Sequence, residues 1–543
     1  MLDPNTPNHA GAQAEVQPTE PTNGSLVKVL NCVVLCIVAV LLILVVIGWW
    51  SRLPSLEGRT TSTALLDTAG TRLGRSITPL VDAHPGLCGI HPLADSRDAF
   101  AARARLAEVA ERTLDVQYYI WQNDMTGTLL FEALRAAADR GVRVRFLLDD
   151  NTTQGLDPML TALDSHSNIE VRLFNPFVIR KPRIGYLTDF SRANRRMHNK
   201  SFTVDNQVTI IGGRNVGDEY FGAAAEGLLF VDLDVVAVGP VVTEVSEDFD
   251  RYWASASSYP LDRIVHSVEP ARIAEVAGAA ARVENDPAAQ AYTAAIRDSP
   301  FIRAVVEGRL EFAWAVTHMI SDDPVKGLGR APSQELFHHQ LTKIIGDPVS
   351  DLELVTPYFV PGETGTDSFV SMARRGVKIR ILTNSLDASD VPAVYSGFAK
   401  RRKPLLEAGI TLYEMRRLSP DAGERDLAGP FGSSGSSLHA KTFSVDRSRF
   451  FVGSLNFDPR SRKLNTELGF VIDSPVLAQR IEAAFHDSIP ANSYEVHLSD
   501  AGRLYWTEDR DGRVLRHDRE PGTRWWLRAA VWSLSRLPIE WLL

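Results

Sequence analysis

The sequence predicts an α/β protein: two fused α/β/α domains related by pseudo-twofold symmetry, preceded by one N-terminal transmembrane helix. Two observations predict the duplication. One His-x-Lys pattern occurs twice with identical spacing, and similar strand–helix–strand segments precede both copies. A long apolar run near the N-terminus predicts the membrane helix. With 543 residues, the chain is also too long for a single hydrophobic core.

The N-terminal region consists of a polar tail and an apolar run. Residues 1–27 are rich in Pro, Asn, Thr and Gly, which predicts disorder. Val29–Trp50 is almost wholly apolar, and a helix of that length crosses roughly 30 Å, the thickness of a bilayer core. We therefore interpret residues 28–51 as a transmembrane anchor. A cleaved signal peptide is the alternative, but the run is too long and Ser51–Pro54 has no small-residue cleavage site.

The charges on either side of the anchor indicate an orientation. Lys28 is the only basic residue before the apolar run, whereas arginines follow it at positions 52, 59, 72 and 75. Basic residues favour the cytoplasmic side of a membrane, so the large domain is expected there.

The rest of the chain repeats a strand, a helix and a strand, an order typical of an α/β sheet covered by helices. The first copy comprises Leu114–Tyr119, Leu129–Asp139 and Gly141–Leu147. The second comprises Leu352–Tyr358, a helix whose last residues are Phe369–Arg375, and Gly376–Leu382. Each helix is followed by a glycine, as a helix C-terminus favours. We expect a first domain at 95–254, a connecting segment at 255–300 and a second domain at 301–490.

The repeated pattern contains the residues that indicate chemistry. The first copy has His198, Lys200, Asp205, Gly212 and Asn215; the second has His439, Lys441, Asp446, Gly453 and Asn456. If each His-x-Lys pair begins a strand, both side chains of the pair point to one face. The aspartates then fall at the following turns, where we expect Asp205 and Asp446 to bind backbone N–H groups. We expect Glu467 and Asp232, at equivalent places in the two copies, to support the histidines.

Two histidines, two lysines and two asparagines facing each other form a site suited to phosphate. Lysine and amide donors stabilise charge on phosphoryl oxygens. One imidazole can attack phosphorus and form a covalent phosphohistidine, while the other transfers the proton. Because the lysines supply the positive charge, we expect no metal and no cofactor. The three cysteines, two of them inside the apolar run, form no zinc pattern and exclude a disulfide-stapled soluble domain.

This constellation resembles the phospholipase D superfamily, and in detail its bacterial cardiolipin synthase branch, especially the C type. The finer likeness lies in Met197–Phe202, Gly212–Asn215, Asp218–Phe221 and Ser454–Ser461. One departure is Gly213, where the second copy has Ser454. The resemblance implies two phospholipase D-like domains, His198 as the nucleophile and His439 as the acid and base. It also implies a single-pass protein of the bacterial inner membrane.

The implied reaction transfers a phosphatidyl group to phosphatidylglycerol and gives cardiolipin. The donor is phosphatidylglycerol or another phospholipid such as phosphatidylethanolamine, and no accessory protein can be identified. Three other readings remain: a phospholipase D-type hydrolase, a nuclease or other phosphodiesterase, and a non-catalytic lipid-binding scaffold. The net charge of −9 counts against nucleic acid as a partner.

The C-terminal extension, 491–543, ends in a segment rich in Trp and Arg. Trp525, Trp526 and Trp532 lie among arginines, a composition typical of a headgroup layer. The alternative is an amphipathic helix packed on the protein's own core. Basic clusters at 180–183, 195–196 and 400–403 are either solvated surface or, together, a site for anionic headgroups.

Overall fold

The computed structural model describes residues 23–183, 185–224, 229–266, 268–297, 299–389, 391–417, 436–510 and 512–540. The chain divides into two units, Met1–Arg52 and Leu53–Leu543. Most of the predicted disordered tail, residues 1–22, lies outside the described residues.

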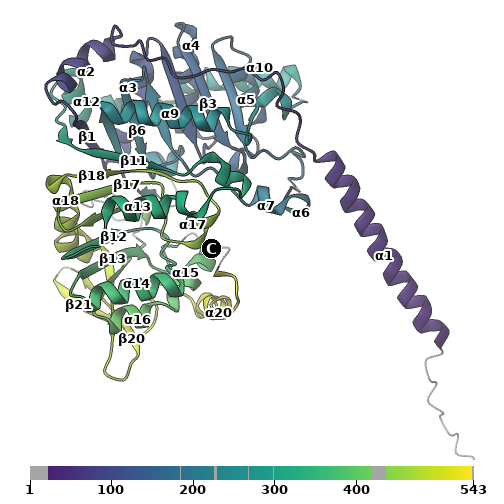
Figure 1. Ribbon diagram of the computed structural model, residues 1–543, viewed down its shortest axis with the longest axis vertical. Coiled ribbons are helices and arrows are strands. Elements are labelled where there is room, and N and C mark those ends of the chain that lie inside the picture. Colours follow the sequence, from purple (N-terminus) through teal and green to yellow (C-terminus); the bar gives the residue numbers. More distant parts are fainter. Residues whose placement is uncertain are drawn as a thin grey trace, which may run out of the picture. The chain divides into compact units, whose positions relative to one another are not determined.

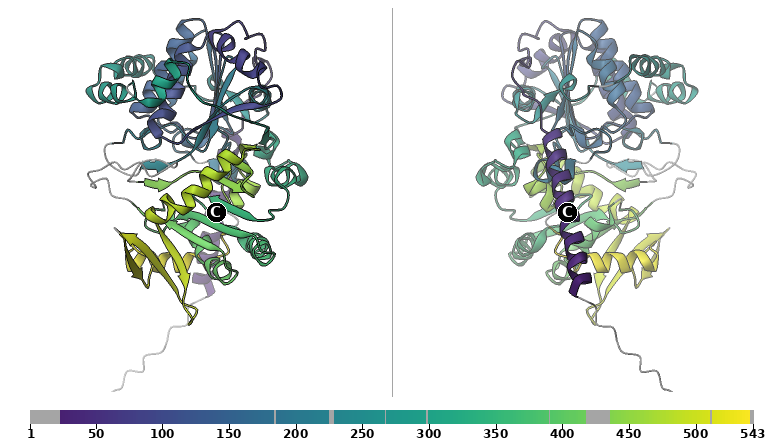
Figure 2. Two further views of the ribbon diagram at one scale, coloured as in Figure 1. Left: turned by 90° about the vertical axis from the view of Figure 1, so that its left-hand side faces the viewer. Right: turned by 90° about the vertical axis from the view of Figure 1, so that its right-hand side faces the viewer.

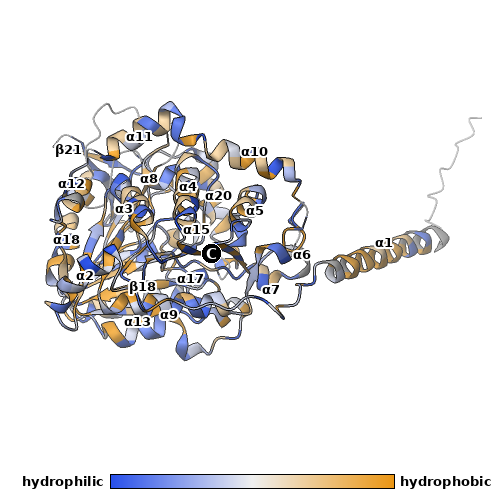
Figure 3. Cartoon of the chain, turned by 90° about the horizontal axis from the view of Figure 1, so that it is seen from above, coloured by the Kyte–Doolittle hydropathy of each residue, from blue (hydrophilic) through white to orange (hydrophobic). Residues whose placement is uncertain are grey.

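The first unit contains one helix, α1, which spans Asn23–Trp50. Its segment Leu30–Trp49 has a mean hydropathy of 3.4, and its length and composition suffice to cross a membrane. Figure 3 shows this apolar character along α1. The helix begins at Asn23 rather than at residue 28, so the last residues of the predicted tail are helical. The lack of charge between Asn23 and Val27 is compatible with that extension.

The second unit contains two large sheets. The first has nine strands in the order β10-β1-β8-β6-β5-β2-β3-β4-β9. Their bounds are Ala313–Ala315, Cys88–Leu93, Asp234–Val238, Val208–Gly212, Ser201–Val204, Thr113–Tyr118, Arg143–Asp149, Ile169–Phe174 and Ser258–Pro260.

The second sheet has ten strands in the order β11-β18-β17-β16-β12-β13-β14-β19-β20-β21. Their bounds are Thr317–Ser321, Leu468–Ile472, Arg449–Gly453, Thr442–Val445, Asp351–Val355, Lys378–Asn384, Thr411–Met415, Ser493–Leu498, Leu504–Arg510 and Arg513–His517. A small parallel sheet joins β7 (Leu229–Val231) of the first half to β15 (Ser436–Leu438) of the second (Figure 2).

The two sheets follow one plan, as the duplicated sequence predicts. In the first, β2, β3 and β4 are parallel, and β5, β6, β8 and β1 continue antiparallel from β2. In the second, β12, β13 and β14 are parallel, and β16, β17, β18 and β11 continue antiparallel from β12. The prediction of two duplicated α/β domains is therefore confirmed.

Helices cover both faces of each sheet (Figure 1). In the first half these are α2 (Arg72–Asp82), α3 (Ser96–Val109), α4 (Met125–Asp139), α5 (Asp157–Asp164), α6 (Gly185–Thr188), α7 (Phe190–Ala193), α8 (Asp218–Phe221), α9 (Pro240–Ala254), α10 (Pro270–Ala280), α11 (Pro287–Arg297) and α12 (Pro300–Val306). In the second half they are α13 (Phe337–Ile345), α14 (Gly362–Arg374), α15 (Pro392–Ala399), α16 (Arg402–Glu407), α17 (Pro459–Lys463), α18 (Pro475–His486), α19 (Ser488–Asn492) and α20 (Trp525–Leu534).

Strand alternation produces two apolar layers on each sheet. In β6, Ile210 packs beneath the outer helices of the first half, whereas its neighbour Ile211 faces the second half. The central layer also contains Val452 and Phe470 from the second sheet, so the halves are joined by an apolar core. This packing brings the ends of β5, β6, β16 and β17 together at one place and so positions the candidate site.

The structure differs from the sequence prediction just before β5 and β16. The prediction placed His198 and His439 at the start of strands, but β5 begins at Ser201 and β16 at Thr442. The backbone of each histidine instead bonds to the other half. His198 N donates to Thr466 O at 3.0 Å, and His439 N donates to Val231 O at 2.7 Å.

Candidate active site

The two histidines each meet a carboxylate from the opposite half of the molecule. His198 Nδ1 lies 2.9 Å from Glu467 Oε2, and His439 Nδ1 makes a short hydrogen bond with Asp232 Oδ2. All four side chains are buried. Both carboxylates were among the sequence-predicted residues, but the sequence did not indicate that the pairs cross between halves.

Glu467 and Asp232 have different neighbours, and this explains why the first copy has Gly213 where the second has Ser454. Ser454 Oγ donates to Glu467 Oε2 and accepts from Leu468 N at 3.0 Å. In the first half, a β-carbon at Gly213 would collide with the Asp232 carboxylate. A serine is therefore accommodated beside the longer glutamate but excluded beside the shorter aspartate.

The lysines lie beside their own histidines and are almost wholly buried. Lys200 Nζ donates to His198 O at 2.6 Å, and Lys441 Nζ lies 3.0 Å from His439 Nδ1. Burial and the charge of Lys441 lower the pKa of Lys200 to about 7. The lysines thus form a concentrated positive centre for an anionic substrate.

The same charges set the protonation of the histidines. Burial, followed by the charges of Lys200 and Lys441, lowers the pKa of His198 well below its ordinary value. Burial and Lys441 lower the pKa of His439 to about 4, against the opposing effect of Asp232. Because lysines of both halves act on both rings, the two His-Lys pairs belong to one electrostatic site with neutral imidazoles at pH 7.

The two carboxylates are electrostatically unequal. Burial raises the pKa of Glu467 to about 7, with Lys200 and Ser454 opposing it. Burial also acts to raise the pKa of Asp232, but His439 and Lys441 outweigh it and the value falls below its usual range. Asp232 is therefore ionised at pH 7, while Glu467 is close to its midpoint.

The two motif asparagines differ in their hydrogen bonding. Asn215 donates to the Tyr220 hydroxyl at 3.2 Å and accepts from Ile120 N at 3.3 Å. Asn456 Oδ1 is buried and has no hydrogen-bond partner among the described residues. Asn456 is thus the asparagine with an amide oxygen left for a hydroxyl or water.

Aromatic side chains that sequence reasoning did not assign to the site pack against the histidines. Tyr119 lies edge-on to His198 with ring centroids 5.0 Å apart, and Tyr220 packs similarly on His439 at 5.2 Å. Phe230, on β7, contacts His439 at 5.1 Å. The sequence signals were that Tyr119 ends a predicted strand and that Tyr220 lies in Asp218–Phe221, one of the segments that carry the family resemblance.

The motif aspartates organise turns away from this centre. Asp205 accepts backbone N–H groups of Arg112 and Thr113 at 2.7 and 2.9 Å. Asp446 accepts those of Val349 and Ser350 at 2.9 and 2.7 Å. Both aspartates fix the start of the neighbouring central strand and contact neither histidine.

Different ion clusters stand behind the two carboxylates. Asp322 Oδ2 accepts from Lys326 Nζ at 2.8 Å and from Glu467 N at 3.1 Å. In the first half, Asp234 accepts from Arg103 and Arg214 at 2.8 and 3.2 Å. These buried groups fix the backbone from which Glu467 and Asp232 project.

One arginine of each basic cluster is bound inside the protein, so these three side chains are neither solvated surface nor free for headgroups. Arg196 is fully buried and donates to Asn175 O, and Arg180 pairs with Asp150. Arg402 is also buried and bonds Glu414 at 3.1 Å. Their partners are carboxylates and a carbonyl that lie 12 to 30 residues away in the sequence.

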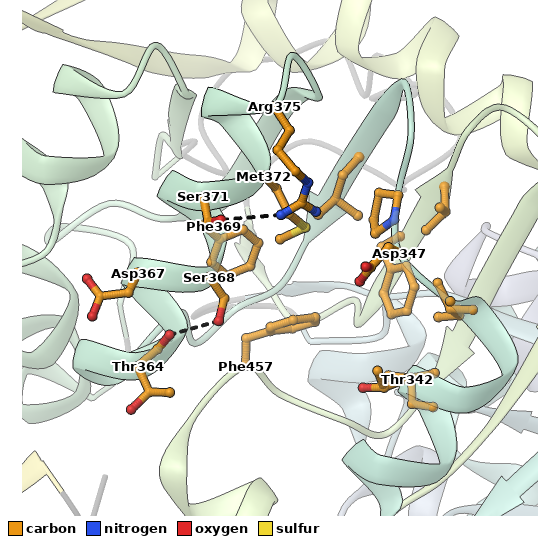
Figure 4. A pocket seen from close by; sticks show the side chains of 17 residues that line it. Thr342, Asp347, Thr364, Asp367, Ser368, Phe369, Ser371, Met372, Arg375 and Phe457 are labelled. Atoms are coloured by element: carbon orange, nitrogen blue, oxygen red, sulfur yellow. Dashed lines mark hydrogen bonds between the residues drawn. The ribbon is translucent and has the colours of Figure 1, made fainter.

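A separate cavity of about 600 Å³ lies between α13 and α14. Its lining includes the apolar side chains of Phe369 and Phe443. Figure 4 shows Arg375, another lining residue, bonded to Ser371. One of its lining residues, Phe457, follows Asn456 in the sequence. The cavity contains none of the histidines or lysines described above.

Fold and site together define a duplicated enzyme of the phospholipase D type. A family model described as "Cardiolipin synthase, PLD-like domain" matches residues 104–253 and 341–489. The chain belongs to this family.

Its relatives include cardiolipin synthase C of Escherichia coli (strain K12), 51% identical over 473 residues, which are 87% of this chain and the whole of that protein. A cardiolipin synthase of Staphylococcus aureus (strain Mu50 / ATCC 700699) is 25% identical over 73% of this chain and 66% of its own length. The crystal structure of phosphatidylserine synthase from Haemophilus influenzae Rd KW20 has the same fold, with a TM-score of 0.51, 15% identity and coverage of 87% of this chain and all of that one.

Proposed function

We propose that the protein is a membrane phosphatidyltransferase that makes cardiolipin from phosphatidylglycerol and a second phospholipid. The observation that carries the proposal is the crossed pairing of His198 with Glu467 and of His439 with Asp232 around two buried lysines. The named relative that shares half of its residues over its full length supports the substrate class.

In this mechanism, the neutral imidazole of His198 attacks the phosphorus of the donor lipid. Glu467 holds Nδ1, which directs attack to Nε2 and stabilises the positive charge that develops. Lys200 and Lys441 offset charge on the phosphoryl oxygens. The bound phosphodiester anion offsets the charge of the lysines, so that His439 takes up a proton from solvent before the reaction. Cationic His439 then gives this proton to the departing alcohol, leaving a phosphatidyl group bound to His198.

In the second step, His439 takes a proton from the free hydroxyl of phosphatidylglycerol. That oxygen attacks phosphorus, the bond to His198 breaks, and cardiolipin is released. Ionised Asp232 stabilises His439 in its transient cationic form. Transfer exceeds hydrolysis when the lipid alcohol outcompetes water, which burial of the site favours.

We further place the protein in the bacterial inner membrane with its large unit on the cytoplasmic side. The apolar helix α1 and the arginines that follow it support this orientation. Phosphatidylethanolamine is a second candidate donor, since the proposed chemistry acts at the phosphodiester and releases whichever alcohol the lipid holds.

The direct test is lipid mass spectrometry of cells that lack cardiolipin and express this chain. Cardiolipin should accumulate with the wild-type protein and be absent with His198→Ala at equal expression. Phosphatidic acid without cardiolipin would identify a hydrolase instead. Equal lipid profiles for both proteins would contradict phosphatidyl transfer through His198 and leave the nuclease and the non-catalytic scaffold.

A further inference from the structure

The C-terminal helix α20 has one face on the protein and one in solvent. Val531 is buried, and Leu527 packs against the core of the second half. After the helix, Glu540 pairs with Lys400 at 2.6 Å and with Arg401 at 3.2 Å. The helix is therefore fixed to the second half, and its outward residues do not result from a loose end.

The outward face of α20 is strongly apolar. Trp525, Trp526 and Trp532 have 75%, 52% and 60% of their area exposed, and Leu537 follows at 50%. Among the described residues after Arg52, the other tryptophans, at 121, 253, 314 and 506, are buried or half-buried. Such a concentration of exposed tryptophan marks an interaction surface rather than ordinary solvent-facing composition.

The charge of this segment indicates the kind of partner. Residues 521–539 contain arginines at 524, 528 and 536 and no acidic residue, although the whole chain carries a net charge of −9. Arg536 lies 3.3 Å from the ring centroid of Trp532, and Arg528 bonds to Thr523 O. Tryptophan with arginine fits the headgroup layer of an anionic bilayer, where indole rings and guanidinium groups both find partners.

A series of packing contacts and hydrogen bonds connects α20 to the candidate site. It packs on α15, which follows the loop after β13, and the same loop contains Asp387 beside Gly522. At the end of β13, Asn384 donates to Leu438 O at 2.9 Å and accepts from Leu438 N at 2.8 Å. Leu438 precedes His439. A membrane bound to α20 would therefore be connected to the acid/base histidine through the loop after β13.

We propose that the tryptophan face of α20 docks on the surface of an anionic bilayer and orients the second half of the active site toward lipid. This inference rests on the proposed membrane function. It assigns a second membrane contact, formed by the folded unit and independent of the apolar helix.

The test reconstitutes the full chain in phosphatidylglycerol vesicles whose lipids carry bromine near the headgroup. The tryptophan fluorescence of the wild type is compared with that of the variant Trp525→Phe/Trp526→Phe/Trp532→Phe. Both proteins contain all the other tryptophans, so the difference in emission comes from α20. About half or more of that difference emission should be quenched by brominated lipid, as expected for interfacial indoles. Equal difference emission in brominated and ordinary vesicles would overturn the proposal.

A transfer assay gives a second readout. Trp525→Ser/Trp526→Ser/Trp532→Ser should lower the initial rate in vesicles about fivefold more than in detergent micelles. The matched control, Val349→Ser/Val514→Ser, removes apolar side chains that are 78% and 72% exposed elsewhere and should change neither rate. An inactive wild type would count against the proposed function, whereas quenching reports docking without turnover. Unquenched tryptophans together with a changed oligomeric state in the serine variant would assign the face to a second copy and refute bilayer docking.

Discussion

At the scale of single residues, the histidine of each half is hydrogen-bonded to a carboxylate of the other half. Glu467 holds His198 at 2.9 Å but is itself near its protonation midpoint, because burial raises its pKa to about 7. Asp232 remains ionised beside His439. The two histidines therefore have unequal electrostatic support, which agrees with separate roles for them.

Glu467→Gln should reduce kcat about 100-fold, because the ring of His198 loses the charge that fixes its tautomer. The change keeps the size of the side chain, so the fold should persist. Steady-state transfer rates in micelles measure the effect. Glu495→Gln, at a half-buried position on β19, is the matched control. Wild-type kcat in Glu467→Gln would remove Glu467 from the mechanism.

The pH dependence follows from the same groups. Activity should rise toward pH 7 as Glu467 ionises and fall above it as Lys200 loses its proton, since both have pKa values of about 7. Glu467→Gln should abolish the acidic limb of the kcat/KM profile. A limb that persists unchanged in that variant would belong to another group.

Ionisation of Glu467 should raise activity but lower the stability of the folded protein. A carboxyl group whose pKa is raised on folding binds more protons in the folded state, so its contribution is present at low pH and is lost as pH rises from about 4.5 to about 7. Wild type should therefore lose more thermal stability than Glu467→Gln over that window. Parallel melting curves at each pH would contradict the assignment.

Gly213 and Ser454 offer a test of the asymmetry. Gly213→Ala places a β-carbon against the Asp232 carboxylate, so kcat should fall about tenfold or more as the carboxylate moves from His439. Ser454→Ala, in the equivalent place, has room and removes one hydrogen bond to Glu467. Transfer rates of the two variants compare the positions. An unaffected Gly213→Ala enzyme would show that this close approach does not fix the aspartate.

At the scale of elements, hydropathy periodicity predicted the central strands and the C-terminal ends of the helices that follow them, α4 and α14, although α4 starts earlier than predicted. β3 and β13 lie within two residues of their predicted places, because local apolar alternation specifies them. The segments before β5 and β16 were assigned wrongly as strand. Their backbone hydrogen bonds go to the opposite half, at Thr466 and Val231, and no local pattern contains that information.

Asp446 organises a turn, a role that the sequence predicted from its position directly after the predicted strand. Its carboxylate accepts N–H groups from Val349, Ser350 and Asp351, and these bonds lower its pKa against the effect of burial. Asp446→Ala should lower the free energy of unfolding by about 1–3 kcal/mol with little change in KM. Because the pKa is lowered on folding, this stabilisation is present above about pH 4 and is lost in acid.

Denaturant titration of the detergent-solubilised protein at pH 7 and pH 3 measures that contribution. The difference between wild type and Asp446→Ala should shrink at the lower pH. A large fall in kcat with unchanged stability would instead indicate direct participation of Asp446 in the reaction.

At the scale of the whole molecule, the duplication predicted a shared site but not how the halves share it. Asp232 and Glu467 occupy equivalent positions in their own halves, so the sequence alone is equally compatible with pairing inside each half. The apolar layer between the sheets, which includes Val235 and Phe470, brings each carboxylate to the opposite histidine. That choice arises from tertiary packing.

The central claim is a covalent phosphatidyl group on His198 that His439 helps to form and to release. The measurement that tests it most directly is mass spectrometry of peptides from enzyme quenched during turnover of phosphatidylglycerol. We predict the adduct on His198 in the wild type and its absence in His198→Asn. An adduct on His439, or cardiolipin synthesis by His198→Asn, would contradict the account.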